Sequence, residues 1–206
     1  SMMSAVGVYW CMDAHMKLGV KGGDVDVASQ YQGDLGADRK GFALKDGGVE
    51  ADVRSLKTDD VIEELDWELD LALKAGCDEF VWDSDGLGVS LRRQVLQAIE
   101  GKKINPVMFR GSEGVENPSL IYQGIDNYDM PDANRTNKET FRNRRAQQYW
   151  TLRDRMLNTH IAITTNKYTD PDEMISLSSD IPELRQLRYE VCRIPRKANG
   201  LGLIQI

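Results

Sequence analysis

Cysteine and histidine are scarce in this sequence of 206 residues, which limits the kinds of site it can build. The three cysteines, Cys11, Cys77 and Cys192, are odd in number and far apart, with no CxxC pair. They indicate reduced thiols of an intracellular protein rather than a disulfide framework or a zinc site. The two histidines, His15 and His160, form no cluster with them. A catalytic metal would therefore have to be held by carboxylates, which favours magnesium or manganese.

Patterns that define several other protein classes are also missing. No run of about 18 apolar residues is present, so we expect no membrane-spanning helix. No basic and apolar leader opens the chain, and its first two residues, Ser-Met, are typical of a cloning scar. The chain has no GxxxxGK phosphate loop and no GxSxG elbow, and two histidines offer little for a Ser-His-Asp triad. Nucleophilic catalysis by a side chain is therefore not expected.

The charge is acidic overall but unevenly distributed. The formal net charge is −7, and a chain this acidic is not expected to coat nucleic acid in general. Residues 1–100, however, sum to about −10, and residues 101–206 to about +3. Half of the acidic excess lies in residues 63–70, for which we expect a solvated helix face. The rest is compatible with a metal site beside an anion-binding surface.

The spacing of the apolar residues predicts one α/β domain with a mixed sheet. The expected elements are a helix within the first 20 residues, antiparallel strands over 24–54, a helix over 59–75, a strand over 80–82, a helix over 89–100, a strand over 104–109, a long loop over 111–137, a helix over 138–157, and a small helix with a strand pair over 181–206. The strand–helix–strand run from 80 to 109 implies parallel pairing. We expect residues 1–22 to be a linker helix with the tag scar, and residues 23–206 to form the domain.

The most informative motif is Trp82-Asp83-Ser84-Asp85-Gly86-Leu87-Gly88, at the end of a predicted buried strand. An aspartate at the carboxyl end of a parallel strand, followed by a glycine turn into a helix, lies where α/β sheets bind ligands. Its carboxylate would have protein on one side and solvent on the other, which suits a divalent metal. The alternative is that Asp83 or Asp85 only caps the following helix.

Four aspartates nearer the N-terminus are further candidates. Strand alternation places Asp24 and Asp26 on one face of the first strand. That strand is either an edge strand with one face exposed to solvent, or a central strand whose carboxylates need a cationic partner. Asp34 and Asp38, in the turn that follows, are typical turn residues, and a functional role is their second interpretation.

Seven basic residues between Arg135 and Arg155 give the second half of the chain its positive charge. Arg142 and Arg145 are expected on one side of the helix predicted there, and guanidinium groups are well suited to phosphate. The alternative is a solvated helix face whose arginines pair with aspartate or glutamate.

Taken in order, these motifs resemble the nuclease domain of the large terminase subunit of tailed bacteriophages, most closely the headful-packaging type. The resemblance covers about residues 13–180, and several blocks in the same order make a chance similarity improbable. The blocks are Ala14-His15, Leu18-Gly19, residues 23–28 with the 33–40 turn, Trp82-Asp83-x-Asp85-Gly86-x-Gly88, Met108-Phe109-x-Gly111-Ser112 and Phe141-Arg142-Asn143-x-Arg145-Ala146-Gln147.

The resemblance implies an RNase H-like fold, in which helices flank both faces of a mixed central β-sheet. It also implies a metal-dependent endonuclease that cleaves double-stranded concatemeric DNA during genome packaging with two Mg²⁺ or Mn²⁺ ions. The family's first acidic ligand, in an Asp-x-Ala setting, falls on Asp26, and its second, at the end of a later strand, falls on Asp83. The weaker metal candidates are Asp24, Asp34, Asp38 and Asp85.

The same resemblance implies a set of partners. These are double-stranded DNA and, in the intact protein, a packaging ATPase domain, the small terminase subunit and the portal, in the cytoplasm of a bacterial host and with no membrane. The candidates for DNA contact are Arg142, Arg145, Arg92, Arg93 and Lys40.

Two departures from the family pattern define an alternative function. The family's third aspartate follows a Ser-Pro-type motif near the C-terminus, and this chain ends at Ile206 before such a motif. We therefore expect a C-terminally incomplete domain that has been excised from its upstream ATPase. The missing acid favours, as the alternative, a non-cutting RNase H-like DNA-binding or assembly module. A junction resolvase is a third hypothesis, which the block at residues 141–147 disfavours.

Overall fold

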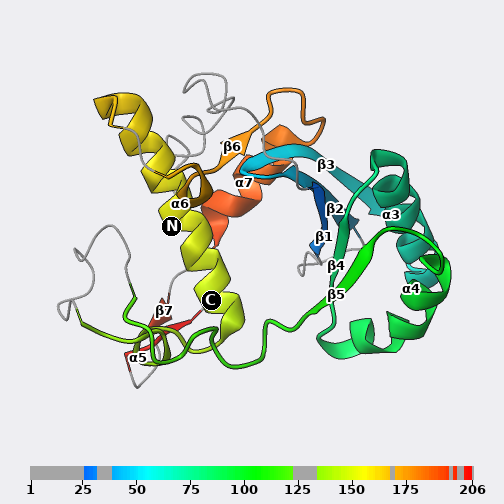
Figure 1. Ribbon diagram of the computed structural model, residues 1–206, viewed down its shortest axis with the longest axis horizontal. Helices are drawn as coiled ribbons and strands as arrows, with labels where there is room; N and C mark the ends of the chain where they lie inside the picture. Colours follow the sequence, from blue (N-terminus) through cyan, green and yellow to red (C-terminus); the bar gives the residue numbers. More distant parts are fainter. Residues whose placement is uncertain are drawn as a thin grey trace.

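The computed structural model describes residues 26–31, 39–122, 134–167, 170–194, 197–198 and 202–205. For residues 26–31, 39–40, 87 and 197–198 the backbone alone is described. The helix expected within the first 20 residues and the candidates Asp24, Asp34 and Asp38 lie outside the described residues. The described part is a mixed α/β structure in which helices pack against one main sheet (Figure 1).

The described strands of the main sheet follow the order β5-β4-β1-β2-β3-β6. Their bounds are Asp26–Tyr31 for β1, Arg39–Asp46 for β2, Val49–Lys57 for β3, Glu79–Asp83 for β4, Asn105–Phe109 for β5 and Ser176–Leu177 for β6. β1, β2 and β3 pair antiparallel, which confirms the antiparallel strands predicted over residues 24–54 as far as these are described. β4 is parallel to both β1 and β5, as the strand–helix–strand pattern predicts. The predicted C-terminal strand pair is also present, as β7 (Lys197–Ala198) and β8 (Ile204–Gln205).

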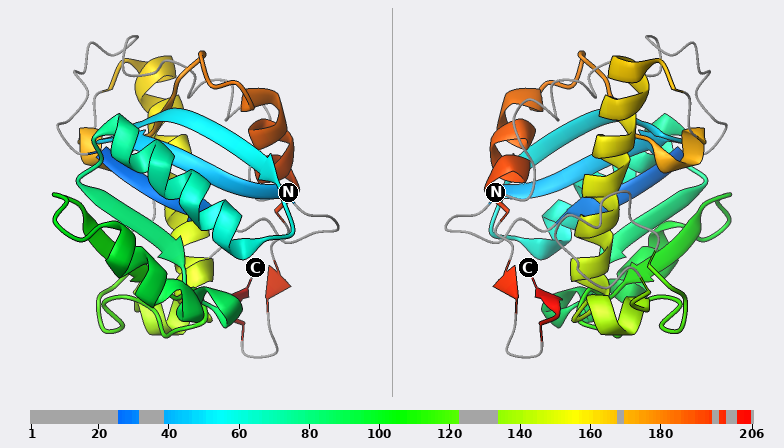
Figure 2. Two further views of the ribbon diagram at one scale, coloured as in Figure 1. Left: turned by 90° about the vertical axis from the view of Figure 1, so that its right-hand side faces the viewer. Right: turned by 90° about the vertical axis from the view of Figure 1, so that its left-hand side faces the viewer.

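One face of the main sheet is covered by α3 (Val61–Ala75), with the 3₁₀ helix η1 (Gly86–Leu91) and α4 (Arg92–Ala98) beside it (Figure 2, left). The apolar side chains of these helices and of the strands beneath them form one buried cluster. Phe80 and Trp82 of β4 lie in this cluster, with their rings stacked 6.2 Å apart. The strand that ends at the predicted metal ligand is thus fixed by apolar packing.

α3 confirms the helix predicted over residues 59–75, since Asp60 caps its first turn and Gly76, with a φ of +74°, ends it. The predicted solvated acidic face is wrong for Glu64 and Glu68, which are 1% and 0% exposed. Being four residues apart, they lie next to the apolar residues that face the sheet, and so share the inward stripe. The helix predicted over residues 89–100 is also shorter than expected, because a 3₁₀ segment precedes α4.

The opposite side of the sheet is crossed by α6 (Arg144–Thr165) (Figure 2, right). Trp150 of α6 belongs to a second buried cluster, against which Val53 of β3 packs. The remaining helices are α5 (Asn137–Thr140), the 3₁₀ helix η3 (Pro171–Glu173) and α7 (Leu184–Arg193). Of the helices in the described residues, none has the length and apolar character needed to cross a membrane.

The helix predicted over residues 138–157 is wrong at its start and at its end. The chain forms α5, becomes extended at Phe141 (φ −115°, ψ 144°), and begins α6 after Asn143. Phe141 is 2% exposed within the second cluster, and the Asn143 side chain accepts a hydrogen bond from the amide of Ala146 as an N-cap. Burial of Phe141 therefore takes precedence over helical continuity, and α6 then runs on to Thr165.

Candidate functional site

β4 places Asp83 at the carboxyl end of a buried parallel strand, as the sequence predicts. Trp82, just before it, is 1% exposed, and its Nε1–H donates to the carbonyl oxygen of Gly88 at 3.1 Å. This bond folds the following turn back over the strand. A Cβ atom on Gly88 would lie 1.8 Å from the carbonyl oxygen of Asp83, so glycine is required for this approach.

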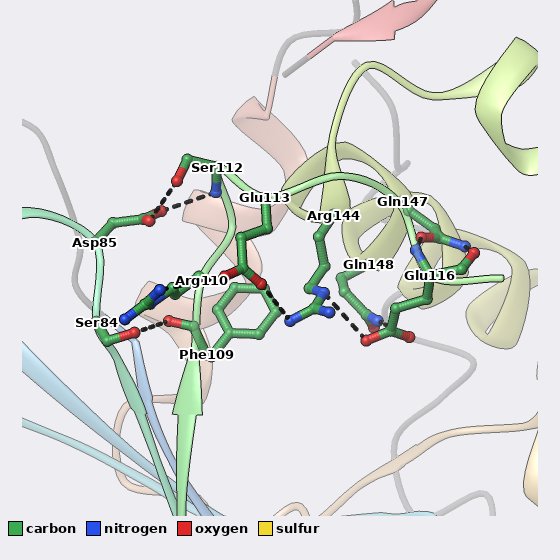
Figure 3. A network of polar contacts seen from close by, with 10 residues as sticks. All are labelled: Ser84, Asp85, Phe109, Arg110, Ser112, Glu113, Glu116, Arg144, Gln147 and Gln148. Atoms are coloured by element: carbon green, nitrogen blue, oxygen red, sulfur yellow. Dashed lines mark hydrogen bonds and ion pairs between the residues drawn. The ribbon is translucent and has the colours of Figure 1, made fainter. Parts of the chain in front are cut away.

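Asp83 uses only one of its two carboxylate oxygens in a described hydrogen bond. Its Oδ1 accepts from the amide of Asp85 at 2.8 Å, whereas its Oδ2 lies 3.7 Å from a guanidinium nitrogen of Arg145. Since η1 begins only at Gly86, the bond to Oδ1 belongs to the turn and not to a helix cap. The Ser84 hydroxyl donates to the carbonyl oxygen of Phe109 at 2.9 Å and ties the turn to β5 (Figure 3).

Both carboxylate oxygens of Asp85 accept hydrogen bonds, and the two from Ser112 are drawn in Figure 3. Its Oδ1 accepts from the Ser112 hydroxyl at 2.6 Å, and its Oδ2 accepts from the Ser112 amide at 3.0 Å and from Arg145 at 2.9 Å. Burial acts to raise the pKa of Asp85, but the hydrogen bonds from Ser112 and the charge of Arg145 outweigh it, so that the pKa is lowered. The helix-capping interpretation is wrong for this residue, because its side chain makes no cap hydrogen bond to η1.

The loop after β5 fixes the position of Arg145. The amide of Arg145 donates to the carbonyl oxygen of Gly111 at 2.9 Å, where α6 begins. A Cβ atom on Gly111 would lie 2.8 Å from Nε of Arg145 and 3.0 Å from its Cβ, so the close approach depends on glycine. Three blocks that lie far apart in the sequence, at residues 83–88, 109–112 and 143–145, therefore meet at one place.

Further polar contacts join residues 110–116, here called the 110–116 loop, to the first turns of α6 (Figure 3). Arg144 forms ion pairs with Glu113 and Glu116, each at 3.3 Å. Gln147 accepts from the amide of Glu116 at 2.7 Å and donates to its carbonyl oxygen at 3.1 Å. Sequence reasoning missed these contacts, because residues 111–137 carry no periodic pattern. The signal in the sequence that could have indicated them is the family-like block over residues 141–147, which ends in Gln147.

The predicted DNA-contacting residues lie on several different elements. Arg142 is in the extended segment before α6, so the prediction that it shares a helix face with Arg145 is wrong. Arg92 and Arg93 are exposed at the start of α4. Lys40 lies in β2 opposite Leu56, and its side chain is outside the described part of the structure. Of these candidates, Arg145 is the one with a described contact to Asp83.

Asp26 occupies the first described position of β1. In the parallel pairing of β1 with β4, Val27 lies opposite Glu79. Asp26 is one residue before Val27 in β1, whereas Asp83 is four residues after Glu79 in β4. In this register the two predicted ligands are about 16 Å apart along neighbouring parallel strands, at roughly 3.3 Å per residue. The described arrangement thus brings Asp85 and Arg145 to Asp83, and does not bring Asp26 there.

The chemistry of Asp83 suits a hard divalent cation. Its Oδ2 has no described hydrogen bond, and carboxylate oxygen is the ligand that magnesium and manganese prefer. Within the described ranges, no three His, Cys, Asp or Glu side chains gather into a metal-binding group. Asp83 is therefore the ligand that the described site offers, since both oxygens of Asp85 are bonded to Ser112 and Arg145.

Comparison with known proteins finds no matching family model and no matching curated protein, but it finds similar solved structures. The nuclease domain of the large terminase subunit gp2 of bacterial virus Sf6 is 36% identical, with a TM-score of 0.89, over 100% of this chain and 86% of that one. A mutant of that domain with manganese and beta-thujaplicinol gives the same identity, TM-score and coverage. A mutant with calcium is 36% identical with a TM-score of 0.89, over 100% of this chain and 87% of that one.

Proposed function

The chain belongs to the family of nuclease domains of the bacteriophage large terminase subunit, and from this membership we propose that it cleaves double-stranded DNA with divalent metal ions. The observation that carries the proposal is the similarity over the whole chain at 36% identity, together with an aspartate at the end of β4. The proposed fold is RNase H-like, with α3 and α4 on one face of the sheet and α6 on the other.

Asp83 and Asp26 are the metal ligands in this proposal, and the cation is Mg²⁺ or Mn²⁺. When bound, two such ions activate a water molecule and stabilise the leaving oxygen. Asp83 is supported by its position and its available Oδ2, and by the manganese and calcium present with the similar domains. Asp26 is supported by its Asp-x-Ala setting alone, because the described register separates it from Asp83. Asp24, Asp34 and Asp38 are the weaker candidates.

The proposed substrate is concatemeric DNA that is cut during genome packaging by a phage or prophage. Arg142, Arg92, Arg93 and Lys40 are the proposed phosphate contacts, together with Arg145, whose side chain is 45% exposed. In the intact protein the partners would be a packaging ATPase domain, the small terminase subunit and the portal, in the cytoplasm of the bacterial host.

Plasmid cleavage in manganese tests this function. We expect the protein to cleave the plasmid. Asp83→Asn and Asp26→Asn should each abolish the cleavage, because each removes a charged ligand. Asp66→Asn, at an exposed position of α3, is the matched control and should cut like the wild type. Undiminished cleavage by Asp83→Asn would overturn the assignment of the site.

A non-cutting DNA-binding or assembly module is the second candidate. It is favoured by the exposed side chains of Arg92, Arg93 and Arg145, because phosphate binding by these arginines needs no metal site. In that case DNA binding should weaken steeply with salt, while the protein cleaves DNA in no divalent metal. Comparison of branched with linear duplexes separates a junction resolvase from both.

A further inference from the structure

Arg145 is shared unequally between two carboxylates. Its Nη2 lies 2.9 Å from Oδ2 of Asp85 and 3.7 Å from Oδ2 of Asp83. The shorter contact is a charge-assisted hydrogen bond, and the longer one is an ion pair without a hydrogen bond. The Asp83 oxygen nearest to Arg145 is the one that has no described hydrogen bond, and so it is the one a cation would use.

The 110–116 loop fixes both partners of the shorter contact. Ser112 donates to Oδ1 of Asp85 through its hydroxyl and to Oδ2 through its amide, so this carboxylate is held from two sides. The carbonyl oxygen of Gly111 accepts a hydrogen bond from the amide of Arg145, and the missing side chain of Gly111 leaves space for the stem of Arg145. The preference of Arg145 for Asp85 therefore follows from the backbone of the loop as well as from charge.

We propose that Asp85 is a positioning residue, which retains Arg145 and so leaves Oδ2 of Asp83 to a divalent cation. A guanidinium group and a metal ion compete for one carboxylate oxygen, because each is positive and repels the other at contact distance. Without the charge of Asp85, Asp83 becomes the carboxylate partner of Arg145 at this place. The inference rests on the proposed function, since it takes Asp83 as a metal ligand. It gives Asp85 a role other than that of a metal ligand.

Calorimetric titration of the metal-free chain with Mn²⁺, without DNA, tests the inference on binding alone. Asp85→Asn should weaken Mn²⁺ binding by about tenfold, because the released Arg145 moves onto Asp83. Arg145→Gln should strengthen binding severalfold, because it removes the competing charge. The double variant Asp85→Asn/Arg145→Gln should bind at least as tightly as the wild type. A merely structural role of the ion pair predicts the opposite, namely weaker binding for Arg145→Gln and no rescue in the double variant.

Asp70→Asn is the matched control, because it removes the same charge from an exposed ion pair with Lys74 on α3. It should leave the Mn²⁺ affinity unchanged. Thermal unfolding of each variant without metal identifies a loss of fold. If Asp85→Asn does not fold, Arg145→Gln decides alone, and an unchanged or lower affinity overturns the inference.

Asp83→Asn separates this inference from the proposed function. If it binds Mn²⁺ as the wild type does, the proposed metal site is wrong and the inference fails with it. If Asp83→Asn loses binding while Asp85→Asn and Arg145→Gln both match the wild type, the metal site stands and only the positioning role of Asp85 is overturned.

Discussion

Each face of the main sheet carries a buried apolar cluster, but the two sides differ in their polar contacts. On the α3 side, the side chains around Phe80 and Trp82 form one buried apolar cluster. On the α6 side, Lys45 and Glu50 lie opposite each other in β2 and β3, and the first turns of α6 bind the 110–116 loop through polar contacts. The α3 side is not free of charge, since Glu64 and Glu68 are buried there.

The difference separates what fixes the position of Asp83, the proposed metal ligand, from what sets the charges around it. Apolar packing on the α3 side fixes where β4 ends, and therefore where Asp83 lies. Polar contacts on the α6 side determine which charges approach its Oδ2. Substitutions on the first side should thus cost stability most, and those on the second should alter stability less and ion binding more.

Trp82→Ala should have the largest effect on stability. The side chain is 1% exposed, packs on Phe80 and donates to the carbonyl oxygen of Gly88, so truncation leaves a cavity and an unpaired acceptor. We expect a loss of about 3–5 kcal/mol in the free energy of unfolding, measured in urea. Leu96→Ala, at a 40% exposed position of α4, is the control and should cost less than about 1 kcal/mol. Equal losses for the two variants would contradict the apolar description of this side.

Gly88→Ala should cost about 3 kcal/mol, because the added methyl group meets the carbonyl oxygen of Asp83 at 1.8 Å. Both partners of this clash are backbone, so the turn itself must move. The matched control is Gly114→Ala in the 110–116 loop, where the new Cβ meets nothing within 4 Å. Urea unfolding of both variants measures the difference, and a neutral Gly88→Ala would show that the turn is not held against β4.

Glu50→Gln tests the buried charge on the α6 side. Burial raises the pKa of Glu50 to about 7, against the opposing charge of Lys45. The folded protein therefore binds this proton more tightly than the unfolded chain does, and the resulting stability is lost as the pH rises through 7. Relative to Glu50→Gln, the wild type should lose about 3 kcal/mol of unfolding free energy between about pH 4.5 and pH 8. Glu100→Gln, at an exposed position, should show no such change, and a flat difference for Glu50→Gln would refute the buried carboxylate.

Gln147→Ala should have the smallest of these effects, about 1 kcal/mol, because it removes two hydrogen bonds to the backbone of Glu116. The neighbouring Gln148 contacts only an exposed carboxylate oxygen of Glu116 among the described residues, so Gln148→Ala should cost a few tenths of a kcal/mol, on the order expected of a surface contact. Thermal unfolding compares the pair. A larger loss for Gln148→Ala would show that Gln148, and not Gln147, holds the 110–116 loop.

The order of the elements could be predicted because it depends on how apolar and polar residues alternate within each short segment. Alternating residues predicted the antiparallel strands, and helical spacing with Asp60 and Gly76 at its ends predicted α3. The start of α6 could not be predicted in this way, because the break comes from the burial of Phe141 in a cluster whose other members are distant in sequence. The burial of Glu64 could not be predicted either, because the composition of a helix does not show which of its faces packs against the sheet.

The candidate site was only half predictable. Asp83 could be found because a buried strand and a glycine turn adjoin it in the sequence. The role of Asp85 could not, because the Ser112 that binds it is 27 residues away and Arg145 is 60 residues away. A local pattern offers a cap as the role of such an aspartate, whereas its true partners come from other segments.

Because these partners are far apart in the sequence, they become available to the site in a fixed order while the chain is synthesised. A chain leaves the ribosome from its N-terminus, and closing a longer loop costs more conformational entropy. Asp83, Asp85 and Ser112 are therefore all outside the ribosome before Arg145 is, and the turn can bind Ser112 before α6 exists. A truncated chain that stops before α6 keeps every acidic group of this turn and lacks the arginine that makes its two aspartates unequal.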